Sequence, residues 1–193
     1  MKKDIILAGV GGQGILSIAA IIGYAAVESG MHLKQAEVHG MSQRGGDVQS
    51  HLRISDDPIH SDLVALGGAD MILSVEPMEG LRYNPYLSEA GWFITNTTPF
   101  VNIPNYPDIE AVLSEVKAHE RRVMLDADSI AKELGNARGM NMVMLGAASQ
   151  FIDLPQQKFE DGVRFLFGRK GDKIVNLNLD AFRKGRALAA EVG

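Results

Sequence analysis

The sequence predicts an α/β domain of three layers, with helices on both faces of a mainly parallel sheet. Three observations support this. Apolar runs of strand length alternate with apolar patterns of helix length along the chain. The first such pair is joined by a glycine-rich turn at residues 9–14. The 193 residues, 46% hydrophobic and 22% charged, suit one globular domain with a buried core.

The first strand and the first helix are both strongly apolar. Residues 4–10 read as a buried parallel strand because their apolar side chains run on without alternation. A helix that is apolar nearly all round is expected over residues 15–26, and Gly30 is placed to end it. Such a helix needs cover on more than one side, which suggests a partner surface.

The turn between them carries the most informative motif. Gly9, Gly11 and Gly14 have the spacing G-x-G-x-x-G, in which the glycines allow a tight turn, the approach of a phosphate and close packing of helix on strand. An anion is expected at the start of the helix, where free N–H groups and the helix dipole favour it. Together with Gly12 and Gln13, these glycines are our candidate cofactor-binding residues in a Rossmann-like fold.

A polar, glycine-rich segment follows the second predicted strand, which spans residues 33–38. We interpret residues 39–46 as a second anion-binding loop, in which Arg44 is a planar, bidentate donor. Ser42 and Gly45 complete the candidate cofactor-binding set. The alternative is a solvated loop with an exposed Arg44.

The rest of the chain continues the alternation. We expect strands over residues 48–54, 71–75, 92–95 and 123–125, and helices over 77–83, 109–117, 128–134, 140–151, 159–166 and 179–192. The 48–54 strand alternates apolar and polar residues, so it is predicted to have one wet face towards a sheet edge. Pro77 is expected at the first position of its helix. The proline-rich segment 96–108 is predicted to be a functional loop or an interface arm. Basic residues of the last helix are predicted to form a solvated face: Arg183, Lys184 and Arg186.

Several classes of function are disfavoured. The net charge of −5 argues against nucleic-acid binding, and no apolar stretch approaches the roughly 18 residues of a membrane span, so a cytoplasmic protein is expected. With no cysteine, the chain can neither ligate an iron–sulfur cluster nor use a thiol nucleophile. No metal-ligand spacing and no nucleophile elbow occur, so we predict no catalytic residue and no metal site. An anion-binding turn without a reaction centre suggests a subunit whose partner holds the chemistry.

The motifs resemble the gamma subunit or domain of the 2-oxoacid:ferredoxin oxidoreductases. The turn at residues 9–14 and the Arg44-Gly45-Gly46 string before a strand are typical of that superfamily. Longer strings are similar to the beta subunit of indolepyruvate ferredoxin oxidoreductase: residues 37–44, 74–77, 81–83 and 141–147. The resemblance covers nearly the whole chain and implies one Rossmann-like domain of the gamma type over residues 1–193.

This resemblance implies a non-redox subunit of an enzyme. Such enzymes oxidatively decarboxylate aryl 2-oxoacids, pass electrons to ferredoxin and release an aryl-acetyl-CoA. In the family, thiamine diphosphate and iron–sulfur clusters lie in a large alpha subunit, so this chain is expected to carry no cofactor and to reach ferredoxin through the complex. Coenzyme A is the expected co-substrate, and the glycine turn and Arg44 are expected to bind its phosphates or to contribute to subunit docking.

Other interpretations remain open at the level of sequence. The chain could be a gamma subunit for pyruvate, 2-oxoglutarate or branched-chain 2-oxoacids. It could be a stand-alone NAD- or flavin-dependent oxidoreductase, in which Glu37 would bind a ribose hydroxyl, although any acid at a strand end would fit that pattern. A scaffold whose only task is assembly is the third alternative.

Overall fold

The computed structural model describes residues 1–39 and 46–191, and it contains one six-stranded sheet in the order β2-β3-β1-β4-β5-β6. The strands are β1 (Lys2–Val10), β2 (His32–His39), β3 (Asp47–Ser55), β4 (Ala69–Ser74), β5 (Leu87–Asn96) and β6 (Arg122–Leu125). Strands β1, β4, β5 and β6 are parallel neighbours, whereas β3 is antiparallel to both β2 and β1. The predicted mainly parallel sheet is confirmed.

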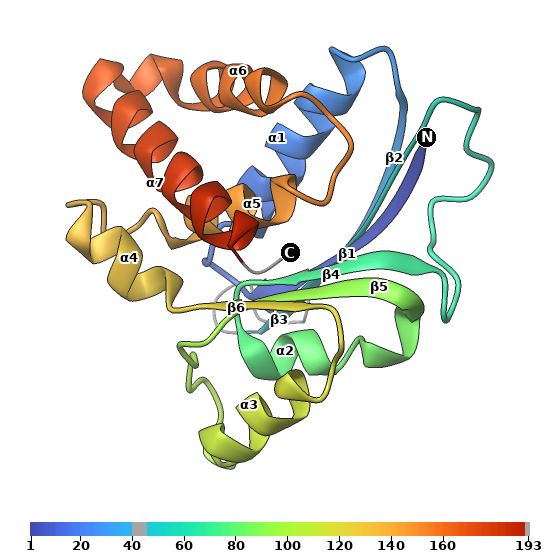
Figure 1. Cartoon of the computed structure of the whole chain (residues 1–193), viewed down its shortest axis with the longest axis vertical. Coiled ribbons are helices and arrows are strands. Elements are labelled where there is room, and N and C mark those ends of the chain that lie inside the picture. Colours follow the sequence, from blue (N-terminus) through green and yellow to red (C-terminus); the bar gives the residue numbers. More distant parts are fainter. Residues whose placement is uncertain (40–45, 192–193) are drawn as a thin grey trace.

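Helices cover both faces of this sheet, as the prediction required (Figure 1). One layer holds α1 (Ile15–Val27), α4 (Ala127–Glu133), α5 (Met140–Ser149), α6 (Gln156–Phe167) and α7 (Asp172–Ala190). The other holds α2 (Pro77–Leu81) and α3 (Ile109–Lys117), and short 3-10 turns lie at Asn84–Tyr86 and Gly168–Lys170. Each layer closes its own apolar core against the sheet. In the described part of the chain, no helix is both long and apolar enough to cross a membrane.

The five-helix layer is built around α5, in which every residue is buried. α7 crosses it so closely that a Cβ atom on Gly146 would lie 1.9 Å from the carbonyl oxygen of Phe182. A Cβ atom on Gly185 would likewise lie 1.9 Å from the carbonyl oxygen of Val143. The two backbones therefore touch, and only glycine fits at either position.

The prediction for the strand at residues 48–54 was wrong in one respect. β3 lies inside the sheet, and the face expected to be wet is partly covered, because His51 is only 5% exposed. The segment after β3 folds back over this face, so that the Val64 N–H donates to His51 Nδ1 at 3.0 Å. On the same face Arg53 forms a bidentate ion pair with the buried carboxylate of Asp4.

Two element boundaries and one surface also differ from the prediction. β5 begins at Leu87, so Gly91 lies within a strand, where a Cβ atom would be 2.5 Å from Leu87 Cδ1. α7 begins at Asp172 rather than at Leu179. Of the basic residues predicted to be solvated, Lys184 and Arg183 are exposed, although Arg183 also donates to Glu160. Arg186 differs from the prediction, because it is half-buried and donates to Ser149 Oγ at 2.8 Å.

Candidate functional site

The glycine-rich turn joins the carboxyl end of β1 to the amino end of α1, as predicted. Gly12 and Gly14 have φ angles of +101° and +86°, in the left-handed region that disfavours any side chain. A Cβ atom on Gly14 would also lie 2.3 Å from Asn141 Nδ2 of α5, and one on Gly9 would lie 2.3 Å from Val75 Cγ2. The third glycine of the motif thus permits helix–helix contact, in addition to the expected turn at the helix start.

The Gln13 side chain holds the turn in shape. Its Oε1 accepts from the Val10 N–H at 2.8 Å, and its Nε2 donates to the Val75 carbonyl at 3.4 Å. The Gly11 N–H donates to the Gly46 carbonyl at 2.8 Å. The amide of Gln13 is therefore engaged within the chain, and the end of the β2–β3 connection is anchored to the turn.

Three of the predicted site residues cannot be placed. Ser42, Arg44 and Gly45 lie outside the described residues. Gly46, which follows them directly in sequence, accepts from the Gly11 N–H at 2.8 Å, so the residue that precedes β3 lies beside the glycine turn.

A buried asparagine extends the site along this edge and was not predicted from the sequence. Asn96, at the end of β5 and 0% exposed, donates through Nδ2 to the Val75 carbonyl at 3.3 Å and to Asp128 Oδ2 at 2.8 Å. Its Oδ1 accepts from the Ala127 N–H at 3.0 Å. Because Gln13 shares the Val75 carbonyl, one hydrogen-bond network joins the ends of β1, β4 and β5 to the start of α4.

Glu76 anchors the proline-rich segment that follows β5. This carboxylate is buried at the N-cap of α2, where it accepts from the Glu79 N–H at 2.7 Å. It also accepts from the Phe100 N–H at 3.3 Å and from the Tyr106 hydroxyl. Burial, followed by the hydrogen bond to Glu76, raises the pKa of Tyr106. The segment is thus tied down, while its side chains at Phe100 and Val101 are exposed to solvent.

Helices that begin at this carboxyl edge differ in how their N-termini are satisfied. Glu76 caps α2 and Asp126 caps α4, each with a second acid in the first turn. The hydrogen bond from the Ser129 backbone lowers the pKa of Asp126. By contrast, α1 and α5 have Gly14 and Gly139 at their N-cap positions, with no side-chain cap among the described residues and no acid in the first turn.

The two uncapped N-termini lie together, because Asn141 Nδ2 of α5 donates to the Gly14 carbonyl at 3.2 Å. Helix N-termini without carboxylates favour anions, through their free N–H groups and their dipoles. This place is therefore the candidate functional site: it contains the predicted Gly9–Gly14 turn and Asn141, which the sequence analysis did not single out for a role. A lone polar residue in an otherwise apolar helix start was the available signal.

Glu37 does not occupy the position of a ribose-binding acid. In the sheet it pairs with Ser50, which in turn pairs with Leu7, so it lies level with the middle of β1. β3 separates β2 from β1, which places Glu37 about 10 Å to the side of β1, at two strand spacings. The Glu37 side chain also accepts from Gln35 Nε2 at 3.1 Å.

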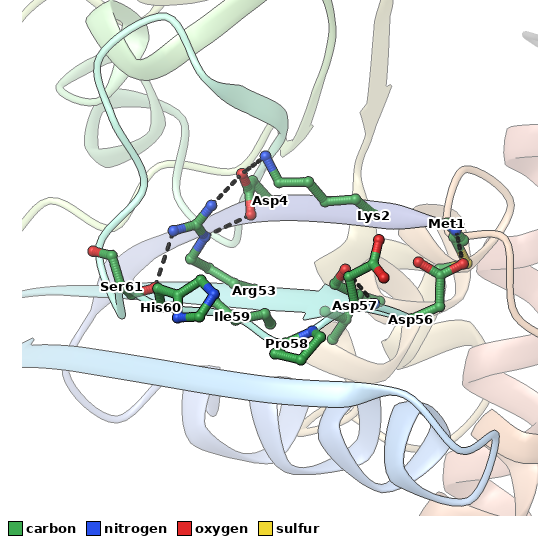
Figure 2. A pocket seen from close by; sticks show the side chains of 12 residues that line it. Met1, Lys2, Asp4, Arg53, Asp56, Asp57, Pro58, Ile59, His60 and Ser61 are labelled. Atoms are coloured by element: carbon green, nitrogen blue, oxygen red, sulfur yellow. Dashed lines mark hydrogen bonds and ion pairs between the residues drawn. The ribbon is translucent and has the colours of Figure 1, made fainter.

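A cavity of about 540 Å³ lies at the opposite end of β1 (Figure 2). Three of its charged side chains interact: Lys2 Nζ lies 2.8 Å from Asp4 Oδ2, and Arg53 donates to both Asp4 and the Ser61 carbonyl. Through these contacts, Arg53 and Asp4 hold the segment after β3 against the sheet. Among the described residues, no group of histidines and acids could hold a metal ion.

Comparison with known proteins decides the family. The family model described as pyruvate ferredoxin/flavodoxin oxidoreductase matches residues 4–188. The chain belongs to this family. Indolepyruvate oxidoreductase subunits IorB of Methanothermobacter thermautotrophicus and Pyrococcus horikoshii are 35% and 36% identical to it, over 99% and 100% of the chain and 100% and 98% of their own lengths. The resemblance recognised in the motifs is confirmed.

Solved structures of this oxidoreductase family share the fold. A 2-oxoglutarate:ferredoxin oxidoreductase from Magnetococcus marinus, described with 2-oxoglutarate, coenzyme A and succinyl-CoA bound, aligns with the whole chain at a TM-score of 0.81 and 23% identity. The chain spans only 32% of that larger polypeptide. The keto/oxoacid ferredoxin oxidoreductase gamma subunit from Geobacter sulfurreducens aligns over 98% of the chain and 99% of its own length, with a TM-score of 0.74 and 22% identity.

Proposed function

We propose that the chain is the small subunit of an indolepyruvate:ferredoxin oxidoreductase, which converts aryl 2-oxoacids to aryl-acetyl-CoA and reduces ferredoxin. Thiamine diphosphate, when bound in a large partner subunit, supplies the decarboxylation chemistry. Since this chain has no cysteine, the thiolates that ligate iron–sulfur clusters must come from the partner. The 34–36% identity to IorB subunits over almost the whole chain favours an aryl substrate.

We propose that the chain binds a phosphate of coenzyme A or borders the entrance through which coenzyme A reaches the active site. The observation that carries this is the pair of uncapped helix N-termini at Gly14 and Gly139, joined through Asn141. The backbone of the Gly9–Gly14 turn would face the anion, and Arg44, two residues before Gly46 in sequence, would add a charge-assisted hydrogen bond. Ser42 and Gly45 belong to the same proposed loop.

Replacement of Arg44 tests this role. In the assembled enzyme, Arg44→Ala should raise the KM for coenzyme A about tenfold to a hundredfold, because a charge-assisted hydrogen bond contributes about 1.5–3 kcal/mol. The KM for indolepyruvate should stay unchanged. Lys184→Ala, which removes an exposed cation in α7, is the control and should leave both constants as they are. An unchanged KM for coenzyme A in Arg44→Ala would assign Arg44 to structure or docking instead.

The first alternative is another 2-oxoacid. Ketoisovalerate oxidoreductase subunit VorA of Methanothermobacter marburgensis is 30% identical, and 2-oxoglutarate synthase subunit KorC of Methanocaldococcus jannaschii is 26% identical. A substrate panel with the assembled enzyme distinguishes these classes. A stand-alone dinucleotide-binding enzyme is disfavoured by the position of Glu37, and a purified chain carrying bound dinucleotide would restore it.

A further inference from the structure

The exposed side of α1 is apolar from one end of the helix to the other. Leu16 and Val27 are 56% and 57% exposed, and Ala20 between them is also exposed. Surface helices ordinarily place polar residues at such positions, as α3 does with the exposed Glu110 and Glu115. α1 carries no charged residue at all, so its outer side is unlike a solvated surface.

This side of α1 forms part of a groove. A cavity of about 310 Å³ lies between α1, the edge strand β2 and α6, which are neighbours in the fold (Figure 1). Gly23 and Ala20 line it from α1, Leu33 lines it from β2, and Phe165 lines it from α6. Phe165 is 73% exposed although its ring stacks on Tyr24, with 5.0 Å between ring centroids.

A glycine keeps the groove open. A Cβ atom on Gly23 would already lie 3.0 Å from Leu33 Cδ2, so any larger residue would fill the space between helix and strand. Among the residues that the structure describes, the groove lining is nearly free of charge, since Glu28 at one end is its one ionisable residue other than Tyr24. An occupant must therefore be apolar, because a charged group placed here would be desolvated without a partner.

The spacing of four residues on this side of α1 indicates the shape of the occupant: Leu16, Ala20 and Val27 are exposed, and the buried Gly23 lines the groove between them. Leu16, Ala20, Gly23 and Val27 follow one another at intervals of four, three and four residues, which is the seam of a helix that packs against another helix. The seam is about 16 Å long, or three helical turns. A helix packs along it by inserting side chains between these positions.

In some relatives, the region that matches this chain is only one part of a longer polypeptide. The Magnetococcus structure and VorA contain the region that matches this chain as 32% and 35% of their lengths. A domain that is found both inside a longer chain and as a separate subunit can keep the same covering surface in both forms. We propose that the α1–β2–Phe165 groove receives an apolar helix of the large partner subunit, an inference that rests on the proposed function.

The test measures the affinity of the full chain for the large subunit that co-purifies with it from native cells. Ala20→Glu places a charge in the groove at an exposed position, so the variant should fold. Ala111→Glu makes the same change at an exposed position of α3, in the other layer, and is the matched control. We expect Ala20→Glu to raise the dissociation constant at least about 100-fold and Ala111→Glu to change it less than about twofold.

A photo-crosslinking residue in place of Val27 identifies the occupant. Crosslinks to a segment of the large subunit with apolar residues at helical spacing would support the proposal. Unchanged affinity in Ala20→Glu, equal loss in both variants, or crosslinks to a second copy of the chain would overturn it. If the wild-type chain captures no large subunit, the proposed function itself fails, whereas capture by wild type and Ala20→Glu alike overturns only the groove.

Discussion

Gly14 is constrained in two independent ways at the candidate site. Its φ of +86° is unfavourable for a side chain, and a Cβ atom would meet Asn141 Nδ2 at 2.3 Å. Gly135, after α4, has a φ of +71° but no atom within 4 Å of its would-be Cβ position. A comparison of Gly14 with Gly135 therefore separates the cost of the left-handed backbone from the cost of the contact with Asn141.

Gly14→Ala should destabilise the fold by more than Gly135→Ala does. We expect about 1–2 kcal/mol for Gly135→Ala from the left-handed backbone alone, and at least about 1 kcal/mol more for Gly14→Ala from the contact with Asn141. Urea unfolding of the isolated chain measures both values. Adding Asn141→Ala to Gly14→Ala should recover part of the difference. Equal losses in the two single variants would show that Asn141 moves aside freely.

At the scale of the element, an ion pair between Glu160 and Arg183 links helices α6 and α7. Glu160, 5% exposed, accepts from Arg183 Nη2 at 2.6 Å and from Arg183 Nε at 2.9 Å. The hydrogen bond from Arg183, opposed by burial, lowers the pKa of Glu160 to about 2. A carboxylate with a lowered folded-state pKa contributes stability above its unfolded pKa, and that contribution is lost as the pH falls through the folded value.

Glu160→Gln should therefore destabilise the chain in a pH-dependent way. The loss should be about 1–2 kcal/mol near pH 7, limited because Arg183 is half exposed, and it should shrink between about pH 4.5 and pH 2. Urea unfolding over this range measures it. Asp161→Asn, which removes a more exposed partner of Arg164, is the control and should cost less than about 0.5 kcal/mol. A loss independent of pH would contradict the assignment.

The crossing of α5 and α7 gives the second prediction at this scale. Gly146→Ala should destabilise the chain by about 3 kcal/mol or more, because its Cβ would collide with a backbone oxygen that cannot rotate away. Gly168→Ala, with nothing within 4 Å of its Cβ, should be neutral or slightly stabilising. Thermal unfolding compares the two variants. A small loss in Gly146→Ala would mean that the helices can separate without cost.

Most elements could be predicted because each depends on local pattern. β1 and α1 are marked by apolar runs on either side of the glycines, and Pro77 at the start of α2 marks that helix as expected. The position of β3 could not be predicted, because its polar side chains His51 and Arg53 are covered by contacts with distant residues. Gly91 resembles a strand terminator, and only its close neighbours across the sheet show why it lies within β5.

Of the described residues at the candidate site, the sequence predicted the glycine turn but neither Asn96 nor Asn141. The Gly9–Gly14 motif locates the turn, since glycine spacing reports backbone geometry directly. Asn96 and Asn141 act through partners many residues away in sequence, and no local pattern reports such partners. The uncapped state of α1 and α5 also needs the fold, because it matters only once those two helix ends lie together.

At the scale of the whole molecule, the two surfaces for which we propose functions lie in different parts of the structure. The glycine turn, the uncapped N-termini of α1 and α5, and the proline-rich segment that donates hydrogen bonds to Glu76 all lie at the carboxyl edge of the sheet. The α1 groove lies along the length of the helix that starts at this edge. A large subunit that covers α1 would therefore reach the start of the same helix, close to the site proposed for coenzyme A.

The most direct test is to purify the tagged chain from its native cells and to assay what accompanies it. The account predicts a large thiamine- and iron–sulfur-containing subunit, and ferredoxin reduction that requires coenzyme A. Activity should be higher with indolepyruvate than with pyruvate, 2-oxoglutarate or ketoisovalerate, and it should be lost when this chain is removed. A lone chain that carries a bound dinucleotide, or a complex that is active without it, would contradict the account.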